Sequence, residues 1–310
     1  MESTLSIVFN EDSVLCALFE PHVKGWQLSD LTVFSGWYDL FIDDFEETLI
    51  GSKLVSYVES IASRIKDVRI VLPPSAVLTR YVPYLPADSQ KQITELLELE
   101  IMQSAPETSV PSYRASFYPM RYARDHGHVM LAVLNRKSAE NTIRRVFLKR
   151  GIMDCMFVVR HVSSHSAFMY SFPESAADTI ILVNADNSQS DVSVLQKRVT
   201  AYFNMIPYSD VQLAPEAISE EILGSVLPVL VSTPEVKPSV MLCGDAVTPS
   251  LISELSKRLE NHVQSVQRLQ AFRMCTTTLD DQHRMFASKW AHRFAANVGS
   301  ILQRGTVAVK

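Results

Sequence analysis

Short apolar runs separated by polar turns open the chain and predict strands. Apolar residues fill 5–9, 14–19 and much of 27–34, and a polar turn occupies 10–13. Runs of this length, bounded by turn residues, are typical of strands. We therefore expect a three-stranded meander at the start of the chain.

Helical periodicity follows the meander and predicts a helix at 53–65, after which the apolar run 68–72 predicts a buried strand. Residues 75–135 then carry a small α+β set of their own, in which Ser89 and Gln92 fit a capping box. We interpret 75–135 as a subdomain inserted into a larger lobe. Its expected elements are strands at 77–82, 113–119 and 129–134 and a helix from Ser89 to before Pro106.

The opening pattern starts again near residue 179. Strands are expected at 179–183, 191–195 and 199–205, with a polar turn after the first of them. Repetition of one element order indicates a duplicated architecture. We expect an α/β fold of two lobes, 1–176 and 177–310, the first of which contains the insertion. Further elements are expected as helices capped by Ser138 and by Thr248, helices at 163–170, 215–230 and 285–303, and strands at 153–159 and 240–243.

Composition excludes several classes of protein. With 47 % hydrophobic and 20 % charged residues, the chain is globular rather than disordered. Its net charge of −5 and the lack of a basic stripe argue against nucleic-acid binding. No apolar run is long enough to span a membrane. The nine glycines are fewer than half of the roughly 20 that average usage gives, which disfavours a glycine-rich phosphate loop.

The cysteines and histidines do not form a recognisable site. Cys16, Cys155 and Cys243 lie in apolar runs, so we interpret them as free core thiols of a protein from a reducing compartment. His161 and His165 have the i, i+4 spacing of a helical metal pair. Neither a glutamate after His161 nor a third ligand accompanies them, and we favour two polar histidines on a helix surface.

Several segments resemble, in order and spacing, the PilM group of type IV pilus assembly proteins and the cytoplasmic part of the type II secretion protein GspL. Each segment is weak alone, but together they cover nearly the whole chain. The resemblance implies an actin/Hsp70-like ATPase fold. The segments are Leu72-Pro73-Pro74 followed by 80–86, 96–101, 147–151, 181–184 with 193–195, 242–246 followed by Pro249, and 294–299.

The resemblance also places three nucleotide loops, and the chain departs from the family in each. The first loop would lie at Asn10 and Ser13 and has no glycine. In the second, the family's aspartate is Asn184 and its glycine is Asp186, whereas the hydroxyls of Ser188 and Ser190 remain. The third, an adenosine loop, keeps only Gly244, which Asp245 follows.

These departures weaken the case for nucleotide chemistry. An amide binds Mg²⁺ less well than a carboxylate does, and an aspartate in a phosphate loop repels polyphosphate. We therefore expect no enzyme activity, no catalytic residue, and no resident metal or cofactor. Binding of Mg-ATP as a conformational switch is the alternative.

In the resembled family, a groove near the inserted subdomain receives the cytoplasmic tail of an inner-membrane partner, PilN in the case of PilM. The resemblance implies such a groove here, with Arg80, Tyr84 and Tyr113 as candidate contacts. Trp26, Trp37 and Tyr38 lie among acidic residues, where they mark either a contact surface for a basic partner segment or anchors of a loop.

The expected function is a cytoplasmic scaffold of a pilus or secretion assembly, peripheral to the inner membrane through its partner and without a membrane span of its own. Self-association is a further expectation. The alternatives are the ATP-binding switch and an actin-like structural or regulatory protein that is unrelated to pili.

Overall fold

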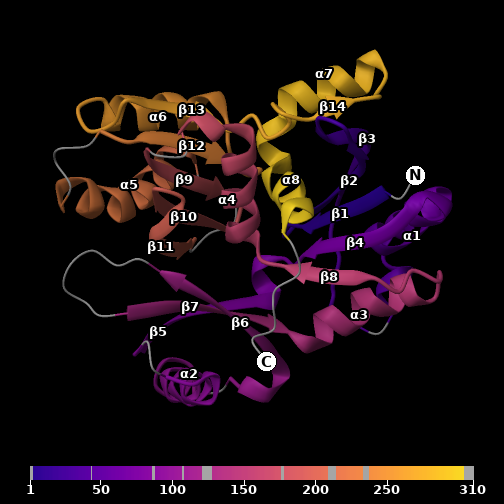
Figure 1. Ribbon diagram of the computed structural model, residues 1–310, viewed down its shortest axis with the longest axis horizontal. Coiled ribbons are helices and arrows are strands. Elements are labelled where there is room, and N and C mark those ends of the chain that lie inside the picture. Colours follow the sequence, from indigo (N-terminus) through magenta and orange to yellow (C-terminus); the bar gives the residue numbers. More distant parts are fainter. Residues whose placement is uncertain are drawn as a thin grey trace. The chain divides into compact units, whose positions relative to one another are not determined.

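The computed structural model describes residues 3–42, 44–85, 88–106, 108–120, 128–175, 178–208, 214–232 and 237–303 (Figure 1). The chain forms two compact units, which we call the first unit (1–160 with 276–278 and 303–310) and the second unit (161–275 with 279–302). The sequence placed the division at 176/177 instead. The difference arises because helix α4 (Arg160–Ser171) packs within the second unit, where the backbone of Ser163 lies against Gly299.

The first unit is built on a mixed sheet with the strand order β14-β3-β2-β1-β4-β8. The meander β1–β2–β3 is antiparallel, whereas β4 and β8 run parallel to β1. Helices α1 and α3 supply the apolar side chains that bury one face of this sheet, among them Leu54, Val58, Ile143 and Phe147. The elements are β1 (Ser3–Phe9), β2 (Ser13–His22), β3 (Gly25–Ser35), α1 (Leu49–Ile61), β4 (Ile65–Val71), α3 (Lys137–Leu148), β8 (Cys155–Val158) and β14 (Thr276–Thr277).

The second unit repeats this topology. Its sheet has the order β11-β10-β9-β12-β13, with an antiparallel meander followed by two parallel strands. Helices α5 and α6 take the places in chain order that α1 and α3 have in the first unit. The duplication expected from the sequence is therefore confirmed. The elements are β9 (Thr179–Ala185), β10 (Gln189–Gln196), β11 (Val199–Pro207), α5 (Pro215–Ser232), β12 (Ser239–Cys243), α6 (Pro249–Leu259) and β13 (Ser265–Arg268).

A three-stranded antiparallel sheet with one helix is inserted into the first unit between β4 and α3. Its order is β5-β7-β6, and α2 lies along one face of it (Figure 1). Ile93, Leu97 and Ile101 of α2 form the buried stripe, and the predicted capping box of Ser89 and Gln92 is present. The second unit has only residues 244–248 at the equivalent place. The elements are β5 (Val77–Tyr84), α2 (Gln90–Ser104), β6 (Tyr113–Met120) and β7 (His128–Arg136).

Among the expected helix boundaries, those of α3 and of the helix expected at 285–303 were wrong. Ser138 does not cap α3, because the helix begins at Lys137 directly after β7 and has no side-chain cap. The expected long helix 285–303 is interrupted: α7 (Asp281–Trp290) is followed by the 3₁₀ turn η6 (Ala291–Phe294) and then by α8 (Ala295–Leu302). The turn allows the carbonyl of His292 to accept the Gly244 N–H at 3.1 Å. Single 3₁₀ turns lie at Phe45–Glu47, Ala62–Arg64, Pro74–Ala76, Val110–Ser112 and Pro173–Ser175.

The cysteines are free thiols, and those of Cys16, Cys155 and Cys243 are buried in strands, as expected. Burial raises the pKa of the Cys155 thiol to about 11, so little reactive thiolate forms near neutral pH. Within the described residues, no helix has the length and apolar character needed to cross a bilayer.

Candidate functional site

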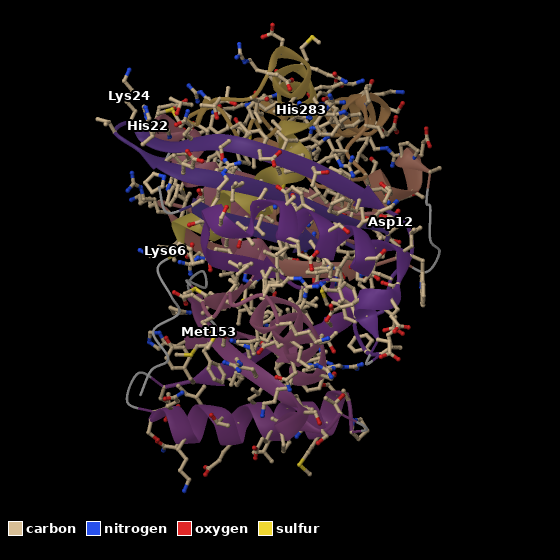
Figure 2. The ribbon with its side chains drawn as sticks, turned by 90° about the vertical axis from the view of Figure 1, so that its right-hand side faces the viewer. Asp12, His22, Lys24, Lys66, Met153 and His283 are labelled. Carbon is tan, nitrogen blue, oxygen red and sulfur yellow. The ribbon has the colours of Figure 1, made fainter. Side chains whose placement is uncertain are left out.

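The first predicted loop is the tight turn that joins β1 to β2, at the end of the strands where Asp12 lies, opposite to His22 and Lys24 (Figure 2). The Asn10 N–H donates to the Ser13 carbonyl at 2.8 Å, and the Asn10 side-chain amide donates to Ser13 Oγ at 3.3 Å. Both residues are buried. The Tyr38 hydroxyl donates to the Asn10 carbonyl. Hydrogen bonds between Asn10 and Ser13, together with the one from Tyr38, thus hold this turn in place.

Arg160 contributes a positive charge to this turn. It follows β8, and its guanidinium donates to Asn10 Oδ1 at 2.8 Å and to the Phe9 carbonyl at 2.6 Å. Sequence reasoning missed Arg160, although a signal existed. The carboxyl ends of parallel strands meet at one edge of a sheet, and Arg160 directly follows the strand expected at 153–159.

The second predicted loop joins β9 to β10 and is built around Asp186. The Asn184 amide donates to Asp186 Oδ2 at 3.1 Å, and the Asp186 N–H donates to the Gln189 carbonyl at 2.9 Å. Asp186 is only 4 % exposed. The thiol of Cys243, on the neighbouring strand β12, reaches Asn184 Oδ1 at 3.6 Å. The side chain that replaces the family's glycine therefore points into the loop and is held there.

The third predicted loop follows β12 and packs directly on the second. Gly244 has a φ of +104°, and a Cβ at this position would lie 2.3 Å from the Ala185 carbonyl oxygen, so only glycine fits. The Asp245 N–H donates to Asp186 Oδ1 at 3.3 Å. The Asp245 carboxylate in turn pairs with Arg293 at 2.6 Å. The structure thus brings Asn184, Asp186 and Gly244 together.

The two serines of the second loop do not join this cluster. Ser190 is fully buried, and its hydroxyl bonds to that of Tyr208. The Ser188 carbonyl accepts the Tyr208 N–H at 2.9 Å, whereas its buried hydroxyl has no hydrogen-bond partner in the described part of the chain.

The nucleotide that the sequence resemblance implies would need phosphate-binding and metal-binding groups in these loops. Phosphates bind to free backbone N–H groups near positive charge. Here the N–H groups of Asp186, Gly244 and Asp245 donate to protein oxygens, and two carboxylates occupy the second and third loops. In the first loop the Arg160 guanidinium lies beside the side chain of Asn10, an amide, which binds Mg²⁺ less well than a carboxylate does.

His161 is buried and His165 is partly buried, so the interpretation as two surface histidines was wrong. The His161 ring packs on Phe203 with centroids 4.5 Å apart, and His165 Nδ1 lies 3.3 Å from Thr200 Oγ1. Burial lowers the pKa of His165 to about 4 and that of His161 well below its usual value. Both contacts come from β11, whose packing on α4 the sequence did not reveal. Within the described residues, no three or more His, Cys, Asp or Glu side chains group as metal ligands.

The predicted partner contacts share one face of the inserted sheet. Arg80, Tyr84 and Tyr113 pair with residues of β7 that lie four apart, on the face that α2 covers. Arg80 donates to Ser104 Oγ at 2.9 Å, at the end of α2. The Tyr84 ring packs against His128. The side chains of Arg80 and Tyr84 therefore make contacts within the inserted subdomain itself.

Tyr113, in contrast, belongs to a junction between the subdomain and the rest of the first unit. The Arg136 guanidinium lies 4.7 Å from the ring centre of Phe41 and 5.8 Å from that of Tyr113, and it donates to the Tyr113 hydroxyl at 3.2 Å. In the same loop as Phe41, Trp37 is 70 % exposed and Ile42 is 37 % exposed. We call Trp37, Phe41, Ile42, Tyr113 and Arg136 the junction patch.

Comparison with known proteins finds relatives by structure alone. No family model and no curated protein matches the sequence. The solved structure of a PilM–PilN type IV pilus biogenesis complex matches with a TM-score of 0.67 at 12 % identity, over 96 % of this chain and 97 % of that one.

Two further structures agree. A Bacteroides thetaiotaomicron protein with an actin-like ATPase fold and unknown function has a TM-score of 0.54 at 14 % identity, over 88 % of this chain and 96 % of its own. The cytoplasmic domain of EpsL, an inner-membrane component of the type II secretion system of Vibrio cholerae, has a TM-score of 0.53 at 9 % identity, over 88 % and 92 %. The chain therefore has an actin-like fold, similar to those of PilM and the EpsL cytoplasmic domain.

Proposed function

We propose that this chain is an adaptor of a type IV pilus or type II secretion-like assembly. It holds the cytoplasmic tail of a PilN-like inner-membrane protein and works without hydrolysing nucleotide. Through that partner it lies at the cytoplasmic face of the inner membrane, where self-association of adaptor copies is an additional expectation.

The observation that carries this proposal is the likeness to the PilM–PilN complex over almost the whole of both chains. The matched length includes the inserted subdomain as well as the duplicated sheets. A fold can serve several functions, so the docking site and the state of the nucleotide loops need support from this chain's own residues.

The junction patch supports the docking part of the proposal. It combines exposed aromatic residues with an arginine, the composition of energetically dominant interface residues. Asp44 and Glu47 are exposed on the same loop as Phe41. Apolar rings beside carboxylates suit a tail with basic and apolar residues. Tyr38, the neighbour of Trp37, is buried, so that of the two aromatics Tyr38 anchors the loop and Trp37 is free to contact a partner.

Binding of a labelled N-terminal tail peptide from a PilN-like membrane protein tests this directly by fluorescence polarisation. Trp37→Ala and Tyr113→Ala should each weaken binding about tenfold or more, because truncating a central aromatic typically costs at least 1–2 kcal/mol. Met102→Ala, which alters an exposed apolar residue of α2, is the control. The proposal fails if the native chain does not bind the tail, or if all three variants bind it equally.

The ATP-binding switch stays a second candidate because of one observation: the buried Ser188 hydroxyl has no hydrogen-bond partner among the residues that the structure describes. A thermal-shift titration with Mg-ATP separates the two. Ligand at about 100 times its dissociation constant adds roughly 2.7 kcal/mol of stability. We expect no shift at millimolar Mg-ATP, and a saturable shift would favour the switch.

A further inference from the structure

We infer that the second unit supplies its own anion: the Asp186 carboxylate occupies the anion-binding position of the β9–β10 loop and hides a latent oxyanion site beneath it. The inference deepens the proposed function and rests on its claim that the loops do not hold nucleotide. It identifies the group that fills the loop and the ligand class, a tetrahedral oxyanion, that the loop would take once this group is removed.

The contacts of Asp186 are those of a bound anion. Oδ1 accepts the backbone N–H of Asp245 at 3.3 Å, and Oδ2 accepts the side-chain amide of Asn184 at 3.1 Å. These donors come from two neighbouring strands, at the ends of β9 and just after β12. Asp186 as a whole is only 4 % exposed. Buried carboxylates are stable only when donors surround them, and backbone and amide N–H groups at strand ends are the donors that phosphate also uses.

The third loop packs so closely on the second that the Asp186 carboxylate fills the space between them. A Cβ on Gly244 would lie 2.9 Å from Asp186 Oδ1, as well as against the Ala185 carbonyl. The nearby carboxylate of Asp245 does not compete for the same donors, because it pairs with Arg293. Asp186 therefore bridges the second and third loops in the way a bound anion would, with no ligand needed to hold them together.

Removal of the Asp186 carboxylate should leave an unfilled space lined by hydrogen-bond donors. In Asp186→Gly, the Asp245 N–H and the Asn184 amide lose their acceptor, and the glycine leaves room for a small oxyanion. Unpaired buried donors destabilise the fold, and a ligand that binds only the folded state restores stability by mass action.

The experiment compares thermal unfolding of the full chain with about 20 mM sodium phosphate, and separately sulfate, against sodium chloride of equal ionic strength. The native protein should not distinguish these salts. Asp186→Gly should melt roughly 5 °C or more lower in chloride, and phosphate should restore roughly half of the loss or more.

Two further variants serve as controls for Asp186→Gly. Asp191→Ala removes another buried carboxylate of the same hairpin, which accepts from Gln189, and should melt lower without a response to phosphate. Asp186→Asn keeps the volume filled and should likewise not respond. If Asp186→Gly folds only in phosphate, the inference is supported. If it responds equally to all salts, or folds in none of them, the inference is wrong.

The outcome is independent of tail docking. A phosphate-responsive Asp186→Gly that still binds the tail agrees with both claims, whereas loss of the phosphate response with intact tail binding overturns the inference alone. Failure of the native chain to bind the tail overturns the proposed adaptor role and leaves the phosphate result standing. A native protein that is itself stabilised by Mg-ATP contradicts the claim on which the inference rests.

Discussion

Gly244 is the residue at which backbone strain and crowding coincide. Its φ of +104° is costly for any residue with a side chain, and its place for a Cβ lies 2.3 Å from a backbone carbonyl oxygen. We expect Gly244→Ala to lower the free energy of unfolding by about 3 kcal/mol or more.

The matched control for this substitution is Gly224, which lies within helix α5 and has no described atom within 4 Å of its Cβ position. Gly224→Ala should stabilise the protein by about 0.5–1 kcal/mol. Urea unfolding monitored by circular dichroism measures both values. Equal effects of the two substitutions would contradict the close approach of the loops at Gly244.

His165 makes the stability of the second unit depend on pH. Burial lowers its pKa to about 4 in the folded state, whereas the unfolded chain binds a proton near pH 6.5. Since the unfolded state then binds more protons, stability is complete above about pH 6.5 and falls as the pH drops toward 4. The loss from this one group reaches about 3 kcal/mol. His292, with its pKa also lowered to about 4, acts in the same direction.

Urea midpoints at about pH 7.5 and about pH 5 check this dependence. His165→Gln should reduce the difference between the two midpoints, because glutamine does not titrate. His262, which is exposed, provides the control, and His262→Gln should leave the difference unchanged. A midpoint difference that His165→Gln does not alter would place the titrating group elsewhere.

The turn of the β10–β11 hairpin has a strained backbone, because two residues with side chains adopt positive φ angles there. Lys197 and Arg198 both have positive φ, +48° and +69°, the conformation of a tight hairpin turn that usually contains Asn-Gly. Arg198→Gly should therefore stabilise the protein by about 1 kcal/mol. In the equivalent β2–β3 hairpin, Gly25 already has a φ of +125°, and Gly25→Ala should destabilise. Differential scanning calorimetry of both variants should give shifts of opposite sign, and shifts of the same sign would contradict the turn geometry.

At the scale of elements, the sequence predicted strands and buried stripes better than their ends. Leu54, Val58 and Ile61 lie on the buried face of α1 as the periodicity predicted. The helix nevertheless begins at Leu49 and not at 53, because Thr48 caps it through the Gly51 N–H. The two short strands β13 and β14 were missed. They have four and two residues, too few to show a period, and only pairing with other strands defines them.

The parts of the candidate site that neighbouring residues in the sequence form could be predicted. The parts that distant segments form together could not. Asn184 and Asp186 are two residues apart at the end of an apolar run, so their turn could be located from the pattern alone. Phe41 could not be assigned, because it reaches Arg136 only through the packing of the insertion. Arg160 was overlooked, although its place directly after an expected parallel strand put it at the same sheet edge as Asn10. The burial of His161 and the partial burial of His165 likewise depend on contacts with β11 that no local pattern records.

The whole molecule is a duplicated fold that has diverged by addition. Both sheets keep one strand order, but only the first unit has a subdomain between its fourth strand and the following helix. Among the residues that the structure describes, the sheet of the first unit alone gains an extra edge strand, β14, from a distant part of the chain. The added elements, and not the shared topology, distinguish the two units. This asymmetry is consistent with a docking role for the first unit.

Charge at the scale of the whole chain adds a prediction about tail binding. The protein has a net charge of −5, and acidic residues are exposed beside the junction patch. Attraction of a basic tail would be screened by salt, whereas burial of Trp37 would not. Raising sodium chloride from about 50 mM to about 500 mM should therefore weaken tail binding about tenfold or more. Trp37→Ala should raise the dissociation constant by the same factor at both concentrations, because its contribution is apolar. A dissociation constant that does not change with salt would show that the carboxylates play no part in recognition and that the rings alone hold the tail.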